Sequence, residues 1–452
     1  MLNKFAGVRE KLSPGLRKII RSVGWLYAEK VLRMVLSLSV GIYVIRYLGS
    51  EAFGKLSYSA SFVGLFGAIA KLGLDAIVVR NVVQDEKATE EIIGTAFFLK
   101  LIGGVITISL ICTASLIFID DVQGRWMTLI IAMGLIFQAF DAIDFWFQSK
   151  VISGPMAVVR SCELIFSSVL KIIFIALRLP LIAFIWLLLV EYIFRAGGMY
   201  FTYLKHGGSL LAWRFSNSRA KQLLQDSWPL ILSAMMITIY MKIDQVMLGN
   251  MVGNEAVGNY AAAVRFSEIW YFVPVAFCAS VFPAIIRAKQ RSTTDYYQKL
   301  QVLYDLMVWM SFSIAIPITL GGNGLMKILL GEEYLEAGNI LALHIWAGPF
   351  VFLGVAQSKW LMAENLTRFS FATTSLGSVS NVVLNFLLIP TYGGMGAALA
   401  TVISYAVSSH FSCLLYRPTF QSGLMLTKAL FIPFRGQQNL IYLGKIRSII
   451  LR

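Results

Sequence analysis

Charged side chains are scarce in this sequence of 452 residues. Asp, Glu, Lys and Arg together make up 14% of the chain, whereas water-soluble proteins contain about a quarter of these residues. Hydrophobic residues make up 58%, and the mean hydropathy is +0.72. This composition excludes an ordinary water-soluble domain and indicates a protein embedded in lipid.

Cysteine and histidine are also rare, with four and three residues, and they form no spacing typical of a metal site. The Gly-x4-Gly-Lys-Ser/Thr motif that cradles nucleotide phosphates is absent. Asp141 and Asp144 form a carboxylate pair at i,i+3, but their place near the end of an apolar run favours a structural or coupling role over acid–base catalysis. We therefore expect no metal, no cofactor and no enzymatic activity.

Apolar runs of about 20 residues or more recur along the whole chain. Each is long enough to cross a hydrocarbon core of about 30 Å as a helix, whereas the strands of a membrane barrel would be shorter and strictly alternating. The twelve predicted spans are residues 22–45, 55–79, 92–118, 126–148, 155–177, 180–203, 228–249, 257–286, 302–326, 338–362, 369–389 and 394–416. The sequence thus predicts an all-α polytopic membrane protein.

Basic residues set the predicted orientation. They gather in residues 1–21, 205–225, 287–299 and 417–452, which all fall on one side if the N-terminus is cytoplasmic. Both termini are therefore predicted to be cytoplasmic. The net charge of +15 is explained by contact with anionic lipids of the inner leaflet, and no nucleic-acid partner is expected. The N-terminal segment lacks a cleavage site and is predicted to lie along the membrane surface.

A short phrase occurs twice in the chain. "GSEAFGKLSYSAS" at residues 49–61 resembles "GNEAVGNYAAAVR" at residues 253–265, and both lie in predicted turns between spans. Gly49 and Gly253 are suited to the left-handed backbone that ends a helix, and the Glu two residues later suits the start of the next helix. Six spans separate the copies, so the two halves enter the membrane in the same direction.

An even number of spans between copies is typical of a parallel repeat, with two bundles around a central cavity. The predicted organisation is a basic cytoplasmic segment at 1–21, an N-terminal six-helix bundle at 22–204, a cytoplasmic linker at 205–225, a C-terminal six-helix bundle at 226–416 and a basic cytoplasmic tail at 417–452. Within that tail, "LMLTKALFIPF" is predicted to form a short surface helix.

Several longer phrases resemble a known family. "VIRYLGSEAFGKLSYSASFVGLFGAIAKLGLDAIVVR", "WPLILSAMMITIYMKIDQVMLGN" and "YGGMGAALATVISY" look like the bacterial polysaccharide (O-antigen) flippases of the multidrug/oligosaccharidyl-lipid/polysaccharide exporter superfamily. The resemblance covers roughly residues 22–416. It implies transport of an undecaprenyl-pyrophosphate-linked oligosaccharide from the inner to the outer leaflet of the bacterial inner membrane. It also implies a glycan polymerase and chain-length proteins as partners.

Three alternatives remain open. A lipid II flippase and a multidrug exporter belong to the same superfamily; twelve spans favour the polysaccharide branch over the first, and a net basic cavity disfavours the second because its substrates are cationic. A membrane glycan polymerase or ligase is the alternative from another class. Such an enzyme would need a sizeable external loop, and the predicted external loops are short.

Charged residues inside the spans are the candidates for function, because they are unfavourable in lipid and face a cavity or a partner. Arg160, Glu163, Ser167, Lys171 and Arg178 fall on one side of a helix and form a polar stripe. Thr374, Ser378, Asn381 and Asn385 form a similar, neutral stripe six spans later. These stripes predict cavity walls.

The predicted pyrophosphate and cavity contacts are Arg33, Arg160, Lys171, Arg265, Asn381 and Asn385. The predicted ion-coupling carboxylates are Asp75, Asp244 and Glu268, with Na+ or H+ as the coupling ion. Structural pairing is the alternative for charges with a partner one turn away, namely Glu29 with Arg33, Lys71 with Asp75 and Arg265 with Glu268. Lys100 is not included among the contacts because no polar stripe accompanies it.

Overall fold

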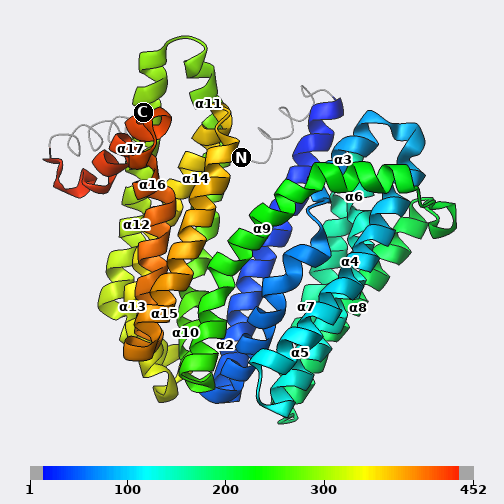
Figure 1. Cartoon of the computed structure of the whole chain (residues 1–452), viewed down its shortest axis with the longest axis horizontal. Helices are drawn as coiled ribbons and strands as arrows, with labels where there is room; N and C mark the ends of the chain where they lie inside the picture. Colours follow the sequence, from blue (N-terminus) through cyan, green and yellow to red (C-terminus); the bar gives the residue numbers. More distant parts are fainter. Residues whose placement is uncertain (1–13, 437–452) are drawn as a thin grey trace, which may run out of the picture. The chain divides into compact units, whose positions relative to one another are not determined.

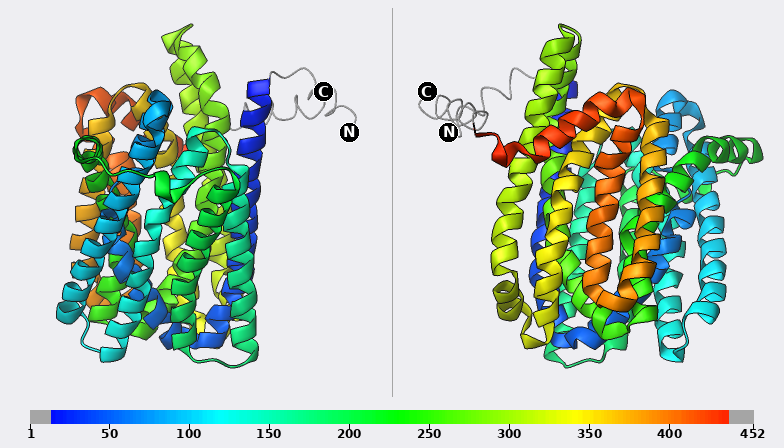
Figure 2. Two further views of the ribbon diagram at one scale, coloured as in Figure 1. Left: turned by 90° about the vertical axis from the view of Figure 1, so that its right-hand side faces the viewer. Right: turned by 60° about the vertical axis from the view of Figure 1, so that its left-hand side comes forward.

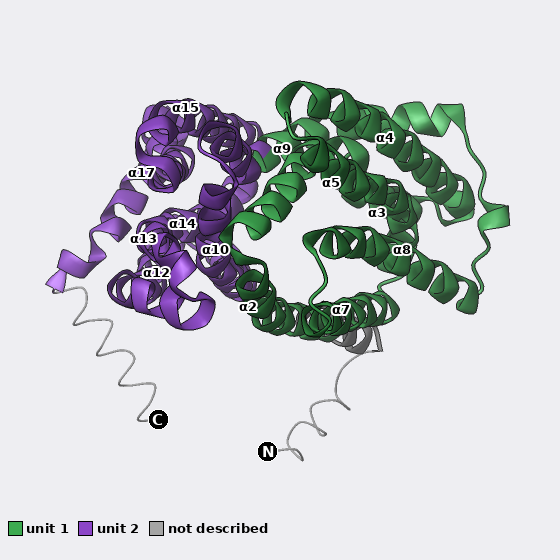
Figure 3. Cartoon of the chain, turned by 90° about the horizontal axis from the view of Figure 1, so that it is seen from below, with its two compact units in different colours: residues 1–238 green, residues 239–452 purple. Residues whose placement is uncertain are grey.

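The computed structural model of the chain describes residues 14–436, and these residues form helices and turns with no strand among them (Figure 1). The chain divides into two compact units, residues 1–238 and 239–452 (Figure 3). The division falls inside helix α9 (Asn217–Met251). The predicted linker, 205–225, overlaps the start of α9, and the predicted domain boundaries stay a prediction.

Unit 1 is a bundle of helices whose axes lie roughly parallel or antiparallel to one another (Figure 2). Its helices before α9 are α2 (Pro14–Lys71), α3 (Asp75–Gln84), α4 (Thr89–Phe118), α5 (Val122–Met133), α6 (Asp141–Ser149), α7 (Gly154–Ala176) and α8 (Leu181–Lys205), with short 3-10 segments at Glu86–Ala88, Gly134–Phe140 (η2) and Leu210–Ala212. Helix α2 packs on α4 and α7, and α7 packs on α8. A buried cluster that includes Ile92, Ile143 and Phe147 joins α4 to α6.

Unit 2 is a second helical bundle, to which the end of α9 contributes. Its other helices are α10 (Asn254–Glu268), α11 (Phe272–Lys289), α12 (Thr293–Leu330), α13 (Leu335–His344), α14 (Gly348–Ala363), α15 (Thr367–Ala406), α16 (Ser412–Leu415) and α17 (Arg417–Leu430), with 3-10 segments at Ile269–Tyr271, Glu332–Tyr334, Ile345–Ala347 (η6) and Ile432–Phe434 and a π segment at Val407–Phe411 (η7). Helix α12 packs on α13 and α14, and α17 packs on α12. Buried residues such as Tyr304, Phe352 and Leu426 form its core.

The helices account for every predicted span. Among the described residues, nine helical stretches are long and apolar enough to cross a membrane. Two of them, Ala28–Gln84 and Arg368–Leu415, each contain two predicted spans joined at a kink. Helix α7 is not among the nine because it carries three charged residues close together, namely Arg160, Glu163 and Lys171. The prediction of an all-α polytopic membrane protein is therefore confirmed.

The repeated phrase adopts nearly the same backbone in both copies. Gly49 has φ 73° and ψ 172°, and Gly253 has φ 126° and ψ 176°. The positive φ was predicted, but the left-handed helical conformation was wrong, because ψ is extended in both residues. An extended ψ turns the chain out of one helix and directly into the next. This region of backbone space is essentially restricted to glycine.

A second turn also recurs, between the fourth and fifth spans of each half. Val151 and Asn365 both have a positive φ, 55° and 59°. The next residue donates its backbone N–H across the turn in each case, Ile152 to the carbonyl of Phe147 at 2.9 Å and Leu366 to that of Leu361 at 2.8 Å. Such six-residue bonds close a helix end. Two matching turns in matching places support the internal repeat.

The ends of the described chain differ in part from expectation. Residues 14–21 are the first turns of α2 and continue the first span, so they form no separate surface segment. Residues 1–13 of that predicted segment lie outside the described residues. The tail contains helix α17, which begins before the predicted surface helix "LMLTKALFIPF" and buries Leu426 in the core of unit 2. The place of this helix at the membrane surface stays a prediction. The rest of the tail, 437–452, also lies outside the described part.

Candidate functional site

The polar stripe of α7 faces protein in unit 1. The guanidinium of Arg195 on α8 donates two hydrogen bonds to the carboxylate of Glu163, at 2.9 and 3.0 Å. The ammonium of Lys171 donates to Glu191 Oε1 of α8 at 2.8 Å, and the hydroxyl of Ser167 donates to the same oxygen. The side chains of Glu163 and Ser167 are almost fully buried. The stripe thus binds α7 to α8.

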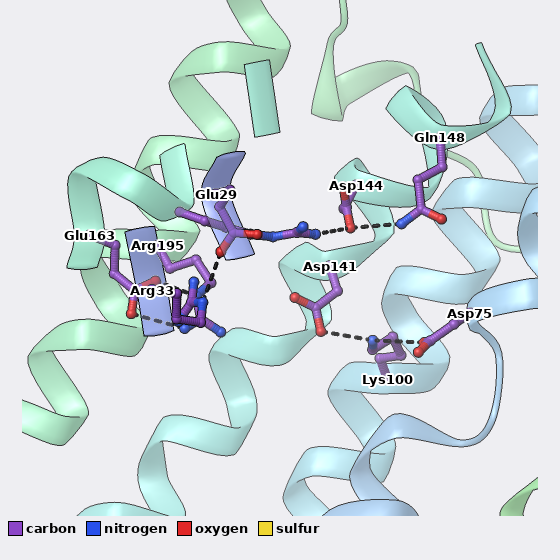
Figure 4. A network of polar contacts seen from close by, with 10 residues as sticks. Glu29, Arg33, Asp75, Lys100, Asp141, Asp144, Gln148, Glu163 and Arg195 are labelled. Carbon is purple, nitrogen blue, oxygen red and sulfur yellow. Dashed lines mark hydrogen bonds and ion pairs between the residues drawn. The ribbon is translucent and has the colours of Figure 1, made fainter. Parts of the chain in front are cut away.

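The stripe is shorter than predicted. Helix α7 ends at Ala176, and Arg178 follows in a turn with φ 54°. The other end of the stripe pairs with α6, because Arg160 donates to Asp144, which also accepts from Gln148 at 2.8 Å (Figure 4). Arg160 therefore has a carboxylate partner on a neighbouring helix.

Lys100 lies close to Asp141 and Asp75 (Figure 4). It is more deeply buried than Arg33, Arg160 or Arg195. Its side chain is fully buried, and its Nζ lies 3.1 Å from Asp141 Oδ2 and 4.0 Å from Asp75 Oδ1. The ring of Phe145 lies 4.9 Å from the same ammonium. A buried lysine with two carboxylates near it needs no substrate to balance its charge. This arrangement favours a structural role for Lys100.

Lys71 and Asp75 do not pair, which corrects the interpretation from their spacing. Helix α2 ends at Lys71, and the next two residues, Leu72 and Gly73, both have a positive φ, 56° and 57°. The helix therefore breaks between Lys71 and Asp75, so the two side chains are not neighbours on one side of a helix. Asp75 lies near Lys100 instead. The expected pair of Glu29 and Arg33, within an unbroken part of α2, is confirmed at 2.8 Å.

A cavity of about 400 Å³ lies inside unit 1, between α2, α5, η2, α8 and the first part of α9. Its polar lining residues are Lys71, Gln138, Glu191, Tyr192, Arg195 and Thr238. Glu191 and Arg195 are the α8 partners of the α7 stripe. Lys71 makes no ion pair within the described chain. The cavity therefore offers one unpaired ammonium and one guanidinium that is already paired.

The predicted cationic contacts of this unit, Arg33, Arg160 and Lys171, do not line the cavity. Each is held by a carboxylate, Glu29, Asp144 or Glu191 respectively. The sequence argument missed Lys71, Glu191 and Arg195 as cavity residues. The available signal was the spacing of Glu191 and Arg195, four residues apart on the span that follows the α7 stripe.

Asp244 is a buried carboxylate of unit 2. The hydroxyl of Tyr260 on α10 donates to it, and Thr401 on α15 lies within 3.4 Å of the same oxygen. Glu268 and Arg265 lie near the end of α10 and are partly buried. Asp75, the third predicted coupling carboxylate, belongs to unit 1 and is largely exposed. Of the three, Asp244 is the most deeply buried.

Asn381 and Asn385 lie fully buried on α15 in unit 2. Asn385 Nδ2 donates to Asn381 Oδ1 at 3.0 Å, while Asn381 Nδ2 and Asn385 Oδ1 have no partner. Both side chains are therefore enclosed by protein in this structure. No group of three or more His, Cys, Asp and Glu residues suited to a metal ion occurs in the described part of the chain.

Two helical bundles, kinked apolar helices and an internal cavity with charged lining residues describe a polytopic membrane protein. The chain belongs to the family described as "Polysaccharide biosynthesis protein", whose pattern matches residues 19–289. The MatE family matches residues 229–387. The predicted family resemblance is confirmed.

Relatives of known name support the same class. A "probable low-salt glycan biosynthesis flippase Agl15" from Haloferax volcanii is 24% identical and covers 81% of this chain and 77% of its own. The "capsular polysaccharide biosynthesis protein CapF" from Staphylococcus aureus is 19% identical over 86% of this chain and 97% of its own. One of these relatives is named a probable flippase and the other a polysaccharide biosynthesis protein.

Solved structures share the fold. An inward-facing multidrug resistance MATE family transporter of the MOP superfamily has a TM-score of 0.71 at 16% identity, with 88% of this chain and 95% of that chain covered. The lipid II flippase MurJ in an inward closed conformation has a TM-score of 0.68 at 14% identity, with 94% and 93% covered. These matches show the architecture of two helical lobes.

Proposed function

We propose that the protein is a flippase for an undecaprenyl-pyrophosphate-linked oligosaccharide. It moves the glycan from the inner to the outer leaflet of a bacterial inner membrane, with both termini cytoplasmic. The family match, the flippase name of the relative from Haloferax volcanii and the bias of basic residues support this proposal. A polymerase and chain-length proteins act on the exported glycan.

The observation that carries the proposal is the unpaired Lys71 in the cavity of unit 1. A diphosphate in a site of low dielectric needs a cation, because an unpaired anion there is very unfavourable. Lys71 provides that charge without the loss of an existing ion pair. Arg195 lines the same cavity and adds a guanidinium with two hydrogen bonds to Glu163.

The other predicted cationic contacts of unit 1 act by exchange of partners. Arg33, Arg160 and Lys171 each leave a carboxylate when they bind a phosphate oxygen. Such exchange keeps the charge of the empty protein balanced. Arg265 of unit 2 stays a predicted substrate contact. Asn381 and Asn385 of unit 2 stay predicted as neutral substrate contacts.

An ion gradient drives the transport, because alternating access requires a ligand that favours one state over the other and the sequence has no nucleotide-binding motif. We propose Asp244 as the main coupling carboxylate, with Na+ or H+ as the ion. Its burial and its contact with Tyr260 and Thr401 support this choice. Asp75 and Glu268 are the further candidates.

The test is the pair of variants Lys71→Gln and Lys71→Arg. A charged hydrogen bond contributes about 1.5–3 kcal/mol, so loss of the charge is expected to reduce glycan export about tenfold or more. Lys71→Arg keeps the charge and retains most export. The measurement is surface glycan per cell, normalised to the amount of protein in the membrane.

Lys299→Gln is the matched control, because this lysine is half exposed and bound to Asp295 outside the cavity. It is expected to export normally. Normal export by Lys71→Gln would contradict the assignment of the cavity.

Two relatives define the runner-up functions. The lipid II flippase MurJ shares the fold, and its substrate class carries the same diphosphate, so the cavity supports this alternative equally. A multidrug exporter is disfavoured, because an unpaired lysine repels the cationic drugs such a transporter binds.

A further inference from the structure

Unit 2 contains a cavity of about 250 Å³ that the transport proposal does not use. It lies between the end part of α9, α14, α15 and the π segment η7. None of the residues that line it is charged, and six of them are serine or threonine. Tyr240, Phe350 and Tyr405 add aromatic rings to the lining. The cavity is therefore polar, neutral and partly aromatic.

The hydroxyl groups of this cavity are arranged as acceptors. Thr373 and Thr374 donate to the carbonyl of Ser370 at 3.0 and 2.9 Å, and Ser409 donates to the carbonyl of Tyr405 at 2.7 Å. Each of these three hydroxyls donates its hydrogen to a backbone carbonyl three or four residues earlier in the chain. The lone pairs on its oxygen remain available to accept a hydrogen bond. A ligand that donates O–H groups satisfies them.

Tyr240 provides the complementary donor. Its side chain is more than nine-tenths buried, and its hydroxyl has no hydrogen bond of good geometry, although Ser408 lies near it. The ring of Tyr240 packs against that of Tyr405, with centroids 4.4 Å apart. A buried hydroxyl without a partner is unfavourable. A ligand oxygen in the cavity removes that penalty.

The backbone keeps the cavity open. A Cβ atom at Gly354 would lie only 3.1 Å from Cβ of Ser409, so a larger residue would push the serine or fill the space. Ser408 and Ser409 belong to η7, where π-type hydrogen bonds interrupt the regular helix. Such π interruptions are frequent at functional sites because they redirect side chains.

We propose that this cavity binds a neutral sugar ring of the lipid-linked glycan. The inference rests on the proposed function and names the part of the substrate that unit 2 recognises. A sugar ring has hydroxyls that both donate and accept, and an apolar face that stacks on aromatic rings. Without a cation, the cavity disfavours a phosphate. Its volume is below the usual range of about 300–1,000 Å³ for drug-sized ligands, which suits a single ring.

The experiment compares two lipids with the full-length protein in nanodiscs. The probes are undecaprenyl diphosphate and undecaprenyl diphosphate linked to N-acetylglucosamine. We expect the wild-type protein to bind the sugar-bearing lipid more tightly. Tyr240→Phe and Thr374→Val each remove one polar atom with little change of shape, and each is expected to weaken binding of the sugar-bearing lipid about threefold to tenfold. Binding of the bare diphosphate lipid stays unchanged.

Tyr392→Phe is the matched control, because Tyr392 lies on the same helix as Thr374 but is exposed and outside the cavity. It leaves both affinities unchanged, and Lys71→Gln weakens both lipids alike. Equal wild-type binding of the two lipids, or equal weakening of both by Tyr240→Phe, overturns the sugar site but leaves the flippase proposal standing. Failure of the wild type to bind either lipid overturns both.

Discussion

At the scale of single residues, the main finding is that the charges of the α7 stripe are paired across helices. Lys171 binds Glu191, and Glu163 binds Arg195. Spacing along one helix reveals neighbours within that helix only, so these partners were not predicted. The stripe itself was predicted, because its residues share one side of a helix. The break after Lys71 was missed because Leu72, an ordinary helix former, adopts a positive φ there.

The pair of Lys171 and Glu191 allows a structural role to be separated from a transport role. Lys171→Gln is expected to abolish glycan export, and Lys171→Arg to retain part of it. The double variant Lys171→Gln/Glu191→Gln removes both charges and leaves no unpaired carboxylate. We expect it to remain inactive, since the cation is missing, while its amount in the membrane is normal.

The measurement is surface glycan, with membrane protein quantified in the same cells. If the double variant exported like the wild type, Lys171 would serve only to balance Glu191, and its role as a substrate contact would be wrong.

At the scale of elements, the recurring turns connect the sequence to the architecture. Long apolar runs predicted the spans well, because hydrophobicity is the main property that identifies membrane-spanning segments. The 3-10 segments η2 and η6, which interrupt the fourth and tenth spans, were not predicted. Their residues have no shared pattern that local preference could reveal, and the packing of the surrounding helices determines them.

The glycine of the second repeated phrase provides a test at this scale. Gly253→Ala meets no neighbouring atom, so its effect comes from the backbone, where φ is 126°. Strain of this kind amounts to about 1–3 kcal/mol, and we expect a lower midpoint of thermal unfolding in detergent.

Gly197→Ala is the control, because this glycine also has open space but lies within α8 at ordinary helical backbone angles. It is expected to leave the midpoint unchanged or raise it slightly. Equal midpoints for the two variants would show that the turn tolerates a side chain.

At the scale of the whole molecule, the family match and the two helical units agree with a polytopic membrane protein of the polysaccharide biosynthesis family. The sequence predicted twelve spans and two bundles, and the helices confirm the spans. The sequence could not predict the cavities or the part of a substrate that each of them binds. The cavities are formed by side chains from helices far apart in the chain, such as Lys71 with Arg195, and Tyr240 with Thr374.

The measurement that tests the central claim most directly is transbilayer movement of undecaprenyl-diphosphate-linked glycan in vesicles that contain the purified protein. With an imposed H+ or Na+ gradient, the account predicts movement of the glycan to the opposite leaflet, loss of that movement when an ionophore removes the gradient, and strong reduction by Asp244→Asn. Absence of movement with either gradient, or undiminished movement after the ionophore, would contradict it.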